Sequence, residues 1–405
     1  MKSEVASKMS DLENALCLAL EWLSGPGMVK DNRPVGTLGK AMGYARWNGA
    51  IRGEYLSAQG EWESYCPVWH TGQAVKAFVM AAEALEEPVL LERAAEAADF
   101  ILAMQFDSGI DAGLIPAYEA EPGKVNTSAI LEAMDGLFML SDAAGDKRYE
   151  ECAVKALEWI ARRTWLQGQG KFVDIYSPDT GKFLEHDPAC QNRPLLDDAV
   201  FLKGWRRSGN REFHQIALET AETLLRDENP PGNWIKYIPC DKNSGKIHPR
   251  HAYWWGNPML DLYRETGDER FFAAFRRAAD WYRGALRSDG GLFRDTAADF
   301  STSSFGHAAS GSACAAIMFE NLYGETGDAS LLPLIDRAEN FCMNMQLTHP
   351  KEPSLKGAIL EKVCFPDGSD TVPFLVRDLG TIFFIQAASL TCKRKRKKGI
   401  LHENH

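Results

Sequence analysis

Glu265-Thr266-Gly267-Asp268-Glu269-Arg270-Phe271 is one copy of a short phrase that recurs along the chain and specifies the fold. Its glycine suits the left-handed conformation that ends a helix, and the aspartate after it suits the cap of the next helix. Variants follow at a spacing of roughly 60 residues, at positions 145–149, 208–213 and 325–328, and 84–88 holds the equivalent place one period earlier. Each copy therefore predicts a tight turn inside a long helical hairpin.

The segments on the two sides of each turn differ in charge. Those after a turn are amphipathic; in the first, Ala94, Ala97 and Ile101 share one face while Glu92 and Glu96 lie opposite. Those before a turn carry few charges, and they span residues 71–85, 127–140, 195–205, 253–263, 311–323 and 379–390. A helix with little charge on any side is buried on all sides. The sequence thus predicts an all-α (α/α)6 toroid of six hairpins, one domain over residues 1–392.

Composition narrows the class of protein. The chain has 405 residues, 45% of them hydrophobic, which suffices for a large core. The absence of a long apolar run and of a signal peptide predicts a cytoplasmic protein that does not span a membrane. The net charge of -11 argues against nucleic acid as a partner, and the nine dispersed cysteines indicate reduced thiols. The basic run at 393–398 is expected to begin a flexible tail, residues 393–405.

Long connections lead from each outer helix to the next inner helix. They are rich in glycine, proline, aromatic residues and histidine, and they cover residues 106–126, 165–193, 229–251, 288–307 and 349–377. Connections of this length usually carry function, and short β-strands are expected within them, for example at 171–176. Because all of them precede inner helices, we expect them to open at one end of the ring.

Three aspartates are candidate catalytic residues. Asp197 and Asp198 are adjacent at the start of an inner helix, about 100° apart around its axis, so only one can point into the cavity. A cavity of low polarity would raise the pKa of that carboxyl and leave it protonated as a general acid. The alternative is that both stabilise the positive end of the helix. Asp135, inside another inner helix, is either a second cavity carboxylate or the partner of an arginine between helices.

Aromatic, histidine and arginine residues near the starts of the inner helices are candidate sugar-binding residues. They are Trp69, His70, Tyr118, Asn126, Arg193, His251, Trp254, Trp255, Asn257, His307, Arg377 and Asp378. Sugars stack on aromatic rings, polar groups hold their hydroxyls, and arginine binds a carboxylate in bidentate fashion. Each also has a structural interpretation: a tryptophan packed between hairpins, a hydrogen-bonding histidine, or a surface Arg–Asp pair. No metal site is expected, and no motif indicates a nucleotide or flavin cofactor.

Two stretches carry a resemblance to a known family. Arg193-Pro194-Leu195-Leu196-Asp197-Asp198-Ala199-Val200-Phe201-Leu202 resembles a segment in which an aspartate opens an inner helix, and His251-Ala252-Tyr253-Trp254-Trp255-Gly256-Asn257-Pro258 is similar to an aromatic-Arg-Gly-Asn-Gly segment. With the hairpin repeat, they resemble the six-hairpin glycosidase superfamily, most of all the unsaturated glucuronyl and rhamnogalacturonyl hydrolases. Trp255 stands where those enzymes often have arginine, and Pro258 where they have glycine.

The leading hypothesis is a glycoside hydrolase that acts on oligosaccharides containing uronic acids. It would use paired carboxylates, or, as the resemblance implies, an aspartate that protonates the C4–C5 double bond of an unsaturated uronyl sugar before water adds at C5. Three alternatives stay open. They are a sugar 2-epimerase with His251 and His307 as acid and base, a polysaccharide lyase, and a non-catalytic carbohydrate-binding toroid. The sequence is also compatible with a homo-oligomer.

Overall fold

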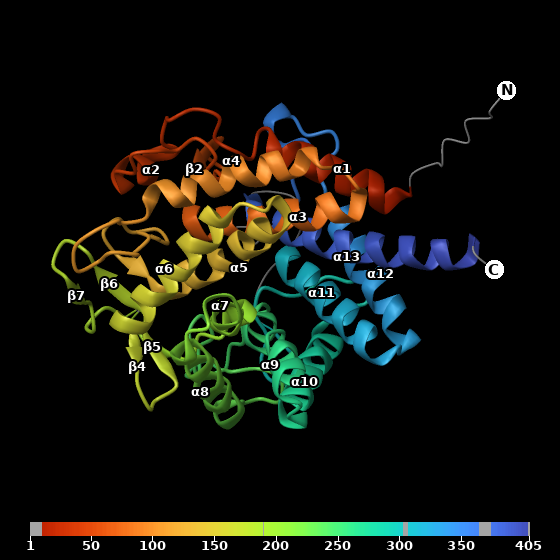
Figure 1. Ribbon diagram of the computed structural model, residues 1–405. Helices are drawn as coiled ribbons and strands as arrows, with labels where there is room; N and C mark the ends of the chain where they lie inside the picture. The colour runs from red at the N-terminus through yellow and green to blue at the C-terminus, as the bar shows by residue number, and fades with distance from the viewer. Residues whose placement is uncertain (1–9, 189, 303–306, 364–373, 404–405) are drawn as a thin grey trace.

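A computed structural model describes residues 10–188, 190–302, 307–363 and 374–403, and it shows helices arranged as a ring in two layers (Figure 1). The inner helices are α3 (Pro67–Leu85), α5 (Thr127–Ala144), α7 (Val200–Ser208), α9 (Met259–Thr266), α11 (Ala309–Thr326) and α13 (Asp378–Glu403). The outer helices are α1 (Asp11–Ser24), α4 (Val89–Met104), α6 (Lys147–Arg163), α8 (Arg211–Asp227), α10 (Glu269–Ala285) and α12 (Leu332–Asn344). Since α13 packs against both α1 and α3, the ring closes and the predicted (α/α)6 toroid is confirmed.

The tight turns have the backbone that the repeated phrase predicts. The glycines that end α5, α7, α9 and α11 all have left-handed backbones, with φ between 68° and 71°. The side chain of the Asp or Asn after each glycine accepts a hydrogen bond from the backbone N–H two residues later, as Asp268 does from Arg270. At the first turn Glu86 takes the left-handed conformation, with φ 58°. Ser10 and Glu13 form a capping box at the start of α1.

Two inner helices begin later than predicted. The third was expected from residue 195, but α7 begins at Val200, after a 3-10 turn (Asp197–Ala199) in which Asp198 and Ala199 have φ of 49° and 50°. The fourth was expected from residue 253, where the structure has a π-helical turn (Ala252–Gly256). Pro258 cannot donate a backbone hydrogen bond, and α9 starts after it. Both irregular turns lie where side chains meet the cavity described below.

Small residues bring α3 and α5 close together. A Cβ atom on Gly72 would lie 2.3 Å from the Cα of Ala133, and one on Gly136 would lie 2.2 Å from the carbonyl oxygen of Gly72. Real Cβ atoms do not approach other atoms so closely, so both positions require glycine. The two backbones therefore pack directly on each other and fix the relative positions of the polar residues that both helices carry into the ring.

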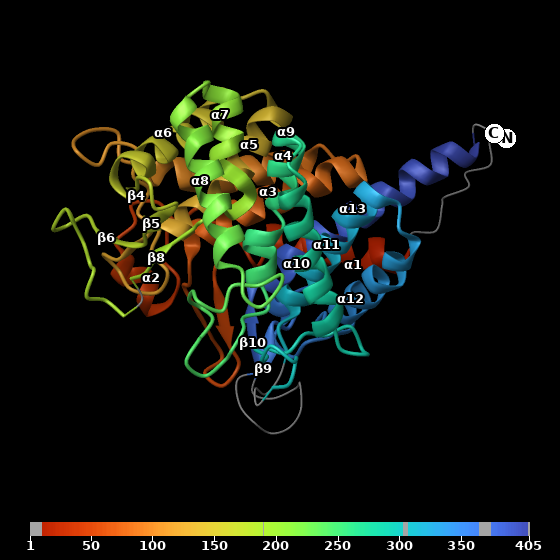
Figure 2. The same ribbon diagram turned by 90° about the horizontal axis from the view of Figure 1, so that it is seen from below.

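Three small sheets join the long connections to one another. Their strand orders are β2 (Glu61–Glu63), β1 (Glu54–Leu56), β10 (Phe374–Arg377), β9 (Lys362–Val363); β3 (Val125–Asn126), β6 (Ile175–Ser177), β7 (Lys182–Phe183); and β4 (Trp165–Leu166), β5 (Lys171–Val173), β8 (Asn192–Arg193). The β1–β10 pair, with Glu54 opposite Arg377, links the segments before the first and the last inner helices. Figure 2 shows β9 and β10 on the lower side of the ring. The short strands expected in the connections are confirmed.

The basic run near the C-terminus continues α13. Lys393 forms an ion pair with Glu83, and Arg394 forms one with Glu320, so the first residues of the expected tail are packed on the ring as part of a helix. The flexibility expected for residues 393–405 stays a prediction, and residues 404–405 lie outside the described part of the chain. Across the described ranges, no helix is both long and apolar enough to cross a membrane.

Candidate functional site

A cavity of about 350 Å³ lies among the segments that precede the inner helices. All six of these segments line it, represented by Tyr65, Asn126, Asp197, Trp254, Arg294 and Arg377. The volume is within the usual range for a site that binds a small molecule. The expectation that the long connections share one end of the ring is therefore met by a single pocket.

Among the carboxyl groups that line this cavity, Asp197 and Glu132 come from neighbouring hairpins and have raised pKa values. Asp197, in the 3-10 turn before α7, is 3% exposed, and its Oδ2 has no hydrogen-bond partner among the described residues. Burial raises the pKa of Asp197 to about 8, although the positive charge of Arg193 opposes this shift. Glu132, on the second turn of α5, has a pKa well above its usual range because of burial and because of the negative charge on Asp197. The pair therefore holds a proton at neutral pH.

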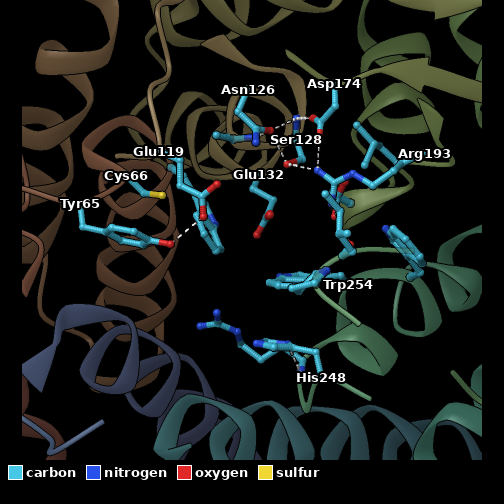
Figure 3. Close-up of a pocket in the computed structure, with 18 of the residues that line it drawn as sticks. Tyr65, Cys66, Glu119, Asn126, Ser128, Glu132, Asp174, Arg193, His248 and Trp254 are labelled. Atoms are coloured by element: carbon cyan, nitrogen blue, oxygen red, sulfur yellow. Dashed lines mark hydrogen bonds and ion pairs between the residues drawn. The ribbon is translucent and has the colours of Figure 1, made fainter. Parts of the chain in front are cut away.

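Arg193 is held by groups of the protein. Its guanidinium forms an ion pair with Asp174, which is fully buried, and donates to the Ser128 Oγ and the Ile238 carbonyl oxygen, both at 3.1 Å (Figure 3). Arg193 lines the pocket, as predicted, but its charge already has a partner. It stabilises the negative form of a nearby carboxyl and is not the free arginine that a substrate carboxylate would need.

Three further arginines stand on the wall of the cavity. Arg377 forms an ion pair with Glu54, and its Cζ lies 4.1 Å from the centre of the Tyr65 ring. Arg250 donates to the Ser310 Oγ at 3.2 Å, while its buried Nε has no partner in the part of the chain that the structure describes. Burial and the positive charge of Arg377 lower the pKa of Arg294. Neither Arg250 nor Arg294 forms an ion pair with another described residue, which sets both apart from Arg193 and Arg377.

Two tryptophans form an aromatic wall of the cavity. Trp254 is stacked on His248, with ring centres 5.4 Å apart and planes at 5°, and the Cζ of Arg250 lies 5.1 Å from its centre. Trp69 meets Trp254 at 6.0 Å. Figure 3 shows Glu132 and His248 on opposite sides of Trp254, so the ring face away from His248 is turned toward Glu132. Burial and the charge of Arg250 hold the pKa of His248 well below its usual range, so it is neutral at pH 7.

The structure separates the predicted aspartates. Asp198 points away from the pocket lining, toward Lys76, whose Nζ lies 2.7 Å from its Oδ1. Asp135 is 2% exposed and binds two lysines, Lys76 at 2.9 Å and Lys203 at 2.6 Å. These ion pairs hold the pKa of Asp135 below its usual value. Only Asp197 of the three lines the pocket; Asp135 was expected as a cavity carboxylate or an arginine partner, and it is instead paired with lysines.

The three predicted histidines are fully buried behind the pocket and do not line it. His70 Nδ1 lies 2.5 Å from Asp378 Oδ1, His251 Nδ1 lies 2.9 Å from the Cys240 Sγ, and His307 Nε2 lies 3.3 Å from the Leu360 carbonyl oxygen. All three stand near the start of an inner helix, and their side chains are buried where neighbouring hairpins pack together. They are not brought together as an acid–base pair. Asp378 likewise stays inside the protein, where it accepts a hydrogen bond from the backbone N–H of Gly53 at 2.8 Å.

Of the remaining predicted residues, some line the pocket and others do not. Trp69, Asn126, Trp254, Trp255 and Arg377 line the pocket. Asn126 also caps α5, since its side chain accepts from the N–H groups of the helix start, and Trp255 is almost fully buried. Outside the lining, Tyr118 stacks on Tyr44 at 5.6 Å and Asn257 accepts a hydrogen bond from Asn321 at 2.8 Å.

Several residues of the cavity were not identified as site residues from the sequence, and four of them matter most for its chemistry: Glu132, His248, Arg250 and Arg294. Glu132 offered the same signal as Asp135, because both are acidic residues inside an otherwise uncharged inner helix. The other three lie in irregular connections, where no periodicity shows which way a side chain points. Among the described residues, no group of three or more His, Cys, Asp or Glu side chains is placed to hold a metal ion.

Comparison with known proteins identifies the fold. No protein-family model and no curated protein sequence matches the chain. Among solved structures, it is similar to a cellobiose 2-epimerase from Bacillus thermoamylovorans, with a TM-score of 0.69 at 11% identity over 94% of this chain and 100% of the other. It is also similar to an unsaturated glucuronyl hydrolase from Bacillus sp. GL1, with a TM-score of 0.65 at 15% identity over 93% and 96%. These likenesses show the (α/α)6 toroid fold.

Proposed function

We propose that this protein is a glycoside hydrolase that acts on oligosaccharides containing a uronic acid. One observation carries the proposal: a carboxyl pair that holds a proton, two arginines without ion pairs to described residues, and a tryptophan all line the same cavity. Each part matches a need of the reaction. The leaving oxygen or the sugar ring needs a proton, the uronate needs a cation, and the apolar face of the ring needs an aromatic surface.

Asp197 is the proposed general acid. Its pKa of about 8 means that most molecules carry the proton at pH 7, and its Oδ2 has no hydrogen-bond partner among the described residues. Glu132 is the proposed second carboxyl group, which takes up a proton from water once Asp197 has given its own away. The two groups come from adjacent hairpins, so their separation depends on the packing of the ring and not on a flexible loop.

Arg250 and Arg294 are the proposed ligands of the uronate carboxylate. A guanidinium group matches a carboxylate with two parallel hydrogen bonds, and the buried Nε of Arg250 has a donor to offer. Since His248 covers one face of Trp254, a sugar would stack on the face turned toward Glu132. This arrangement would place the ring between the aromatic surface and the carboxyl pair.

Two routes fit these groups, and both consume one water. In the direct route, Asp197 protonates the glycosidic oxygen while Glu132 accepts a proton from the attacking water. In the hydration route, Asp197 gives its proton to C4 of an unsaturated uronyl sugar, water adds its oxygen to C5 and returns a proton to the carboxyl pair. The hemiketal formed then opens and releases the rest of the chain.

A 2-epimerase is the second candidate, because solved epimerases and a mannose isomerase share the fold. Epimerisation needs an acid and a base on the two sides of a sugar carbon. Among the described residues that line the cavity, His248 is the single histidine, and it is stacked on Trp254. The carboxyl pair is therefore a better match for hydrolysis than the histidines are for epimerisation.

The test is an assay on unsaturated uronyl disaccharides and on matched saturated glycosides. Loss of the ultraviolet absorbance of the enol ether indicates the hydration route, and sugar release from the saturated glycoside alone indicates the direct route. Asp197→Asn and Glu132→Gln should each remove most of the activity, while Asp280→Asn, at an exposed ion pair, should leave it unchanged. Incorporation of solvent deuterium at C2 of a free sugar without bond cleavage would refute hydrolysis in favour of epimerisation.

A further inference from the structure

A buried polar network lies directly behind the carboxyl pair, on the side away from the cavity. Its ionic part runs from Lys203 to Asp135 at 2.6 Å, from Asp135 to Lys76 at 2.9 Å, and from Lys76 to Asp198 at 2.7 Å. The side chains of Asp135, Lys76 and Asp198 are 3%, 11% and 8% exposed. Charges this deep are costly unless each is paired, so the loss of one partner destabilises the folded protein.

Gln73 connects this network to the backbone of α5 at Glu132. Its Nε2 donates to the backbone carbonyl oxygen of Glu132 at 2.6 Å and to the Oδ2 of Asp198 at 3.2 Å. Its own side-chain oxygen accepts from Gln386 on α13 at 3.1 Å. The glutamine is therefore held in one orientation, and it ties the turn of α5 that carries Glu132 to the residue that follows Asp197.

The backbone around Asp198 is irregular in a way that needs support. Asp198 and Ala199 both have positive φ, 49° and 50°, a region that residues with a Cβ rarely adopt and almost never adopt in succession. In a regular helix start the two aspartates would differ by about 100°. The left-handed pair instead turns Asp198 inward to Lys76 while Asp197 remains on the cavity wall.

We propose that Asp198 is a positioning residue, whose bonds to Lys76 and Gln73 hold the left-handed turn and thereby keep the Asp197 carboxyl in the cavity opposite Glu132. The inference rests on the proposed function only in naming Asp197 as the acid; the structural claim, that Asp198 sets where Asp197 points, stands apart from it. Asp198 is not among the residues that line the cavity, so it acts through Asp197.

The experiment compares Asp198→Asn with Lys203→Met. Both remove a charge from the same network, but Lys203 forms its ion pair with Asp135 and none with Asp198. For Asp198→Asn we expect kcat to fall at least about tenfold, with KM within twofold of the wild type. The alkaline limb of the pH profile should also move to lower pH, because the negative charge of Asp198 helps to keep Asp197 protonated against the positive charge of Arg193. Lys203→Met should lower Tm and leave kcat and the pH profile unchanged.

Crystal structures of the same variants decide the structural claim without an activity. In Asp198→Asn, the carboxyl of Asp197 should move away from its place opposite Glu132, because the ion pair to Lys76 is lost; in Lys203→Met it should stay. If no uronyl substrate is turned over by the wild type, the proposed function fails, while the crystal structures still support or refute the positioning role. An unmoved Asp197 with unchanged kcat and pH profile in Asp198→Asn would overturn the inference.

A second variant covers the case in which Asp198→Asn does not fold. Gln73→Leu removes the hydrogen bond to Asp198 and leaves the Lys76 ion pair. We expect a smaller effect in the same direction, a fall in kcat of about two- to fivefold with a matching displacement of Asp197. A Gln73→Leu protein with wild-type kcat and an unmoved Asp197 would refute the positioning role.

Discussion

Replacement of Asp197 by asparagine should lower activity and raise stability, and the gain in stability should grow with pH. The pKa of this carboxyl is about 8 in the folded protein against an ordinary value of 3.8. Between these values the folded state keeps a proton that the unfolded state has lost, so the wild type loses stability as pH rises from about 4 to about 8. Asparagine does not titrate, and the variant escapes this loss.

The size of the stability gain follows from the interval between pH 5 and the pKa of Asp197. Between pH 5 and a pKa of about 8 lie about 3 pK units, which correspond to about 4 kcal/mol of unfolding free energy. An unfolding entropy of about 2.1 cal/mol/K per residue, taken over 405 residues, converts this into a Tm difference of roughly 5 °C. Loss of a general acid typically lowers kcat by about 10² to 10⁴.

The assay is thermal unfolding of wild type and Asp197→Asn from pH 5 to pH 9, with kcat measured on the same preparations. The Tm of the variant relative to the wild type should rise through this range and level off above pH 8. A Tm difference that stays constant across the range would show that the folded protein does not hold the proton on Asp197, and the general-acid role would fall with it.

Other predictions concern the substrate and the packing. Arg250→Gln and Arg294→Gln should each raise KM for a uronyl substrate by about 10- to 100-fold, because each removes a charged hydrogen bond; the methyl ester of the same substrate should be affected less than twofold, and equal effects on acid and ester would contradict the assignment. Trp254→Ala should raise KM while Trp254→Phe largely restores it, since stacking needs an aromatic face; an equal loss in both variants would exclude stacking. Gly72→Ala should destabilise the protein by about 1–3 kcal/mol in denaturant unfolding, because its Cβ would collide with Ala133. Gly324→Ala, on α11 with open space around it, should be neutral or slightly stabilising, and a similar loss at both glycines would count against the close packing of α3 on α5.

The fold could be predicted from the sequence because its signals are local and repeated. A glycine that ends a helix and an aspartate that caps the next one specify a turn wherever they occur, and Gly267 with Asp268 does so as its relatives do. The contrast between amphipathic and uncharged segments then specifies which helix is outside. The third and fourth inner helices begin at residues 200 and 259, later than the sequence predicts. A left-handed turn at Asp198 and a π-helical turn before Pro258 do not change the hydrophobic periodicity, so the sequence does not reveal them.

The site was less predictable, because it depends on the direction of individual side chains in irregular segments. His70, His251 and His307 share a position in the repeat, yet all three turn into the protein. Asp197 and Asp198 were recognised as alternatives, but the choice between them is made by Lys76, more than 100 residues away in sequence. Arg250 could only be recognised once the tertiary structure placed it against Trp69 and Trp254.

One end of the ring is proposed to bind and protonate an acidic sugar. The sharpest test is a crystal structure of Asp197→Asn soaked with an unsaturated uronyl disaccharide. We expect a sugar ring stacked on Trp254, its carboxylate bonded to Arg250 or Arg294, and its C4 facing residue 197 beside Glu132. A sugar bound elsewhere on the ring, or one in the cavity with its carboxylate turned away from both arginines, would contradict the proposed mechanism.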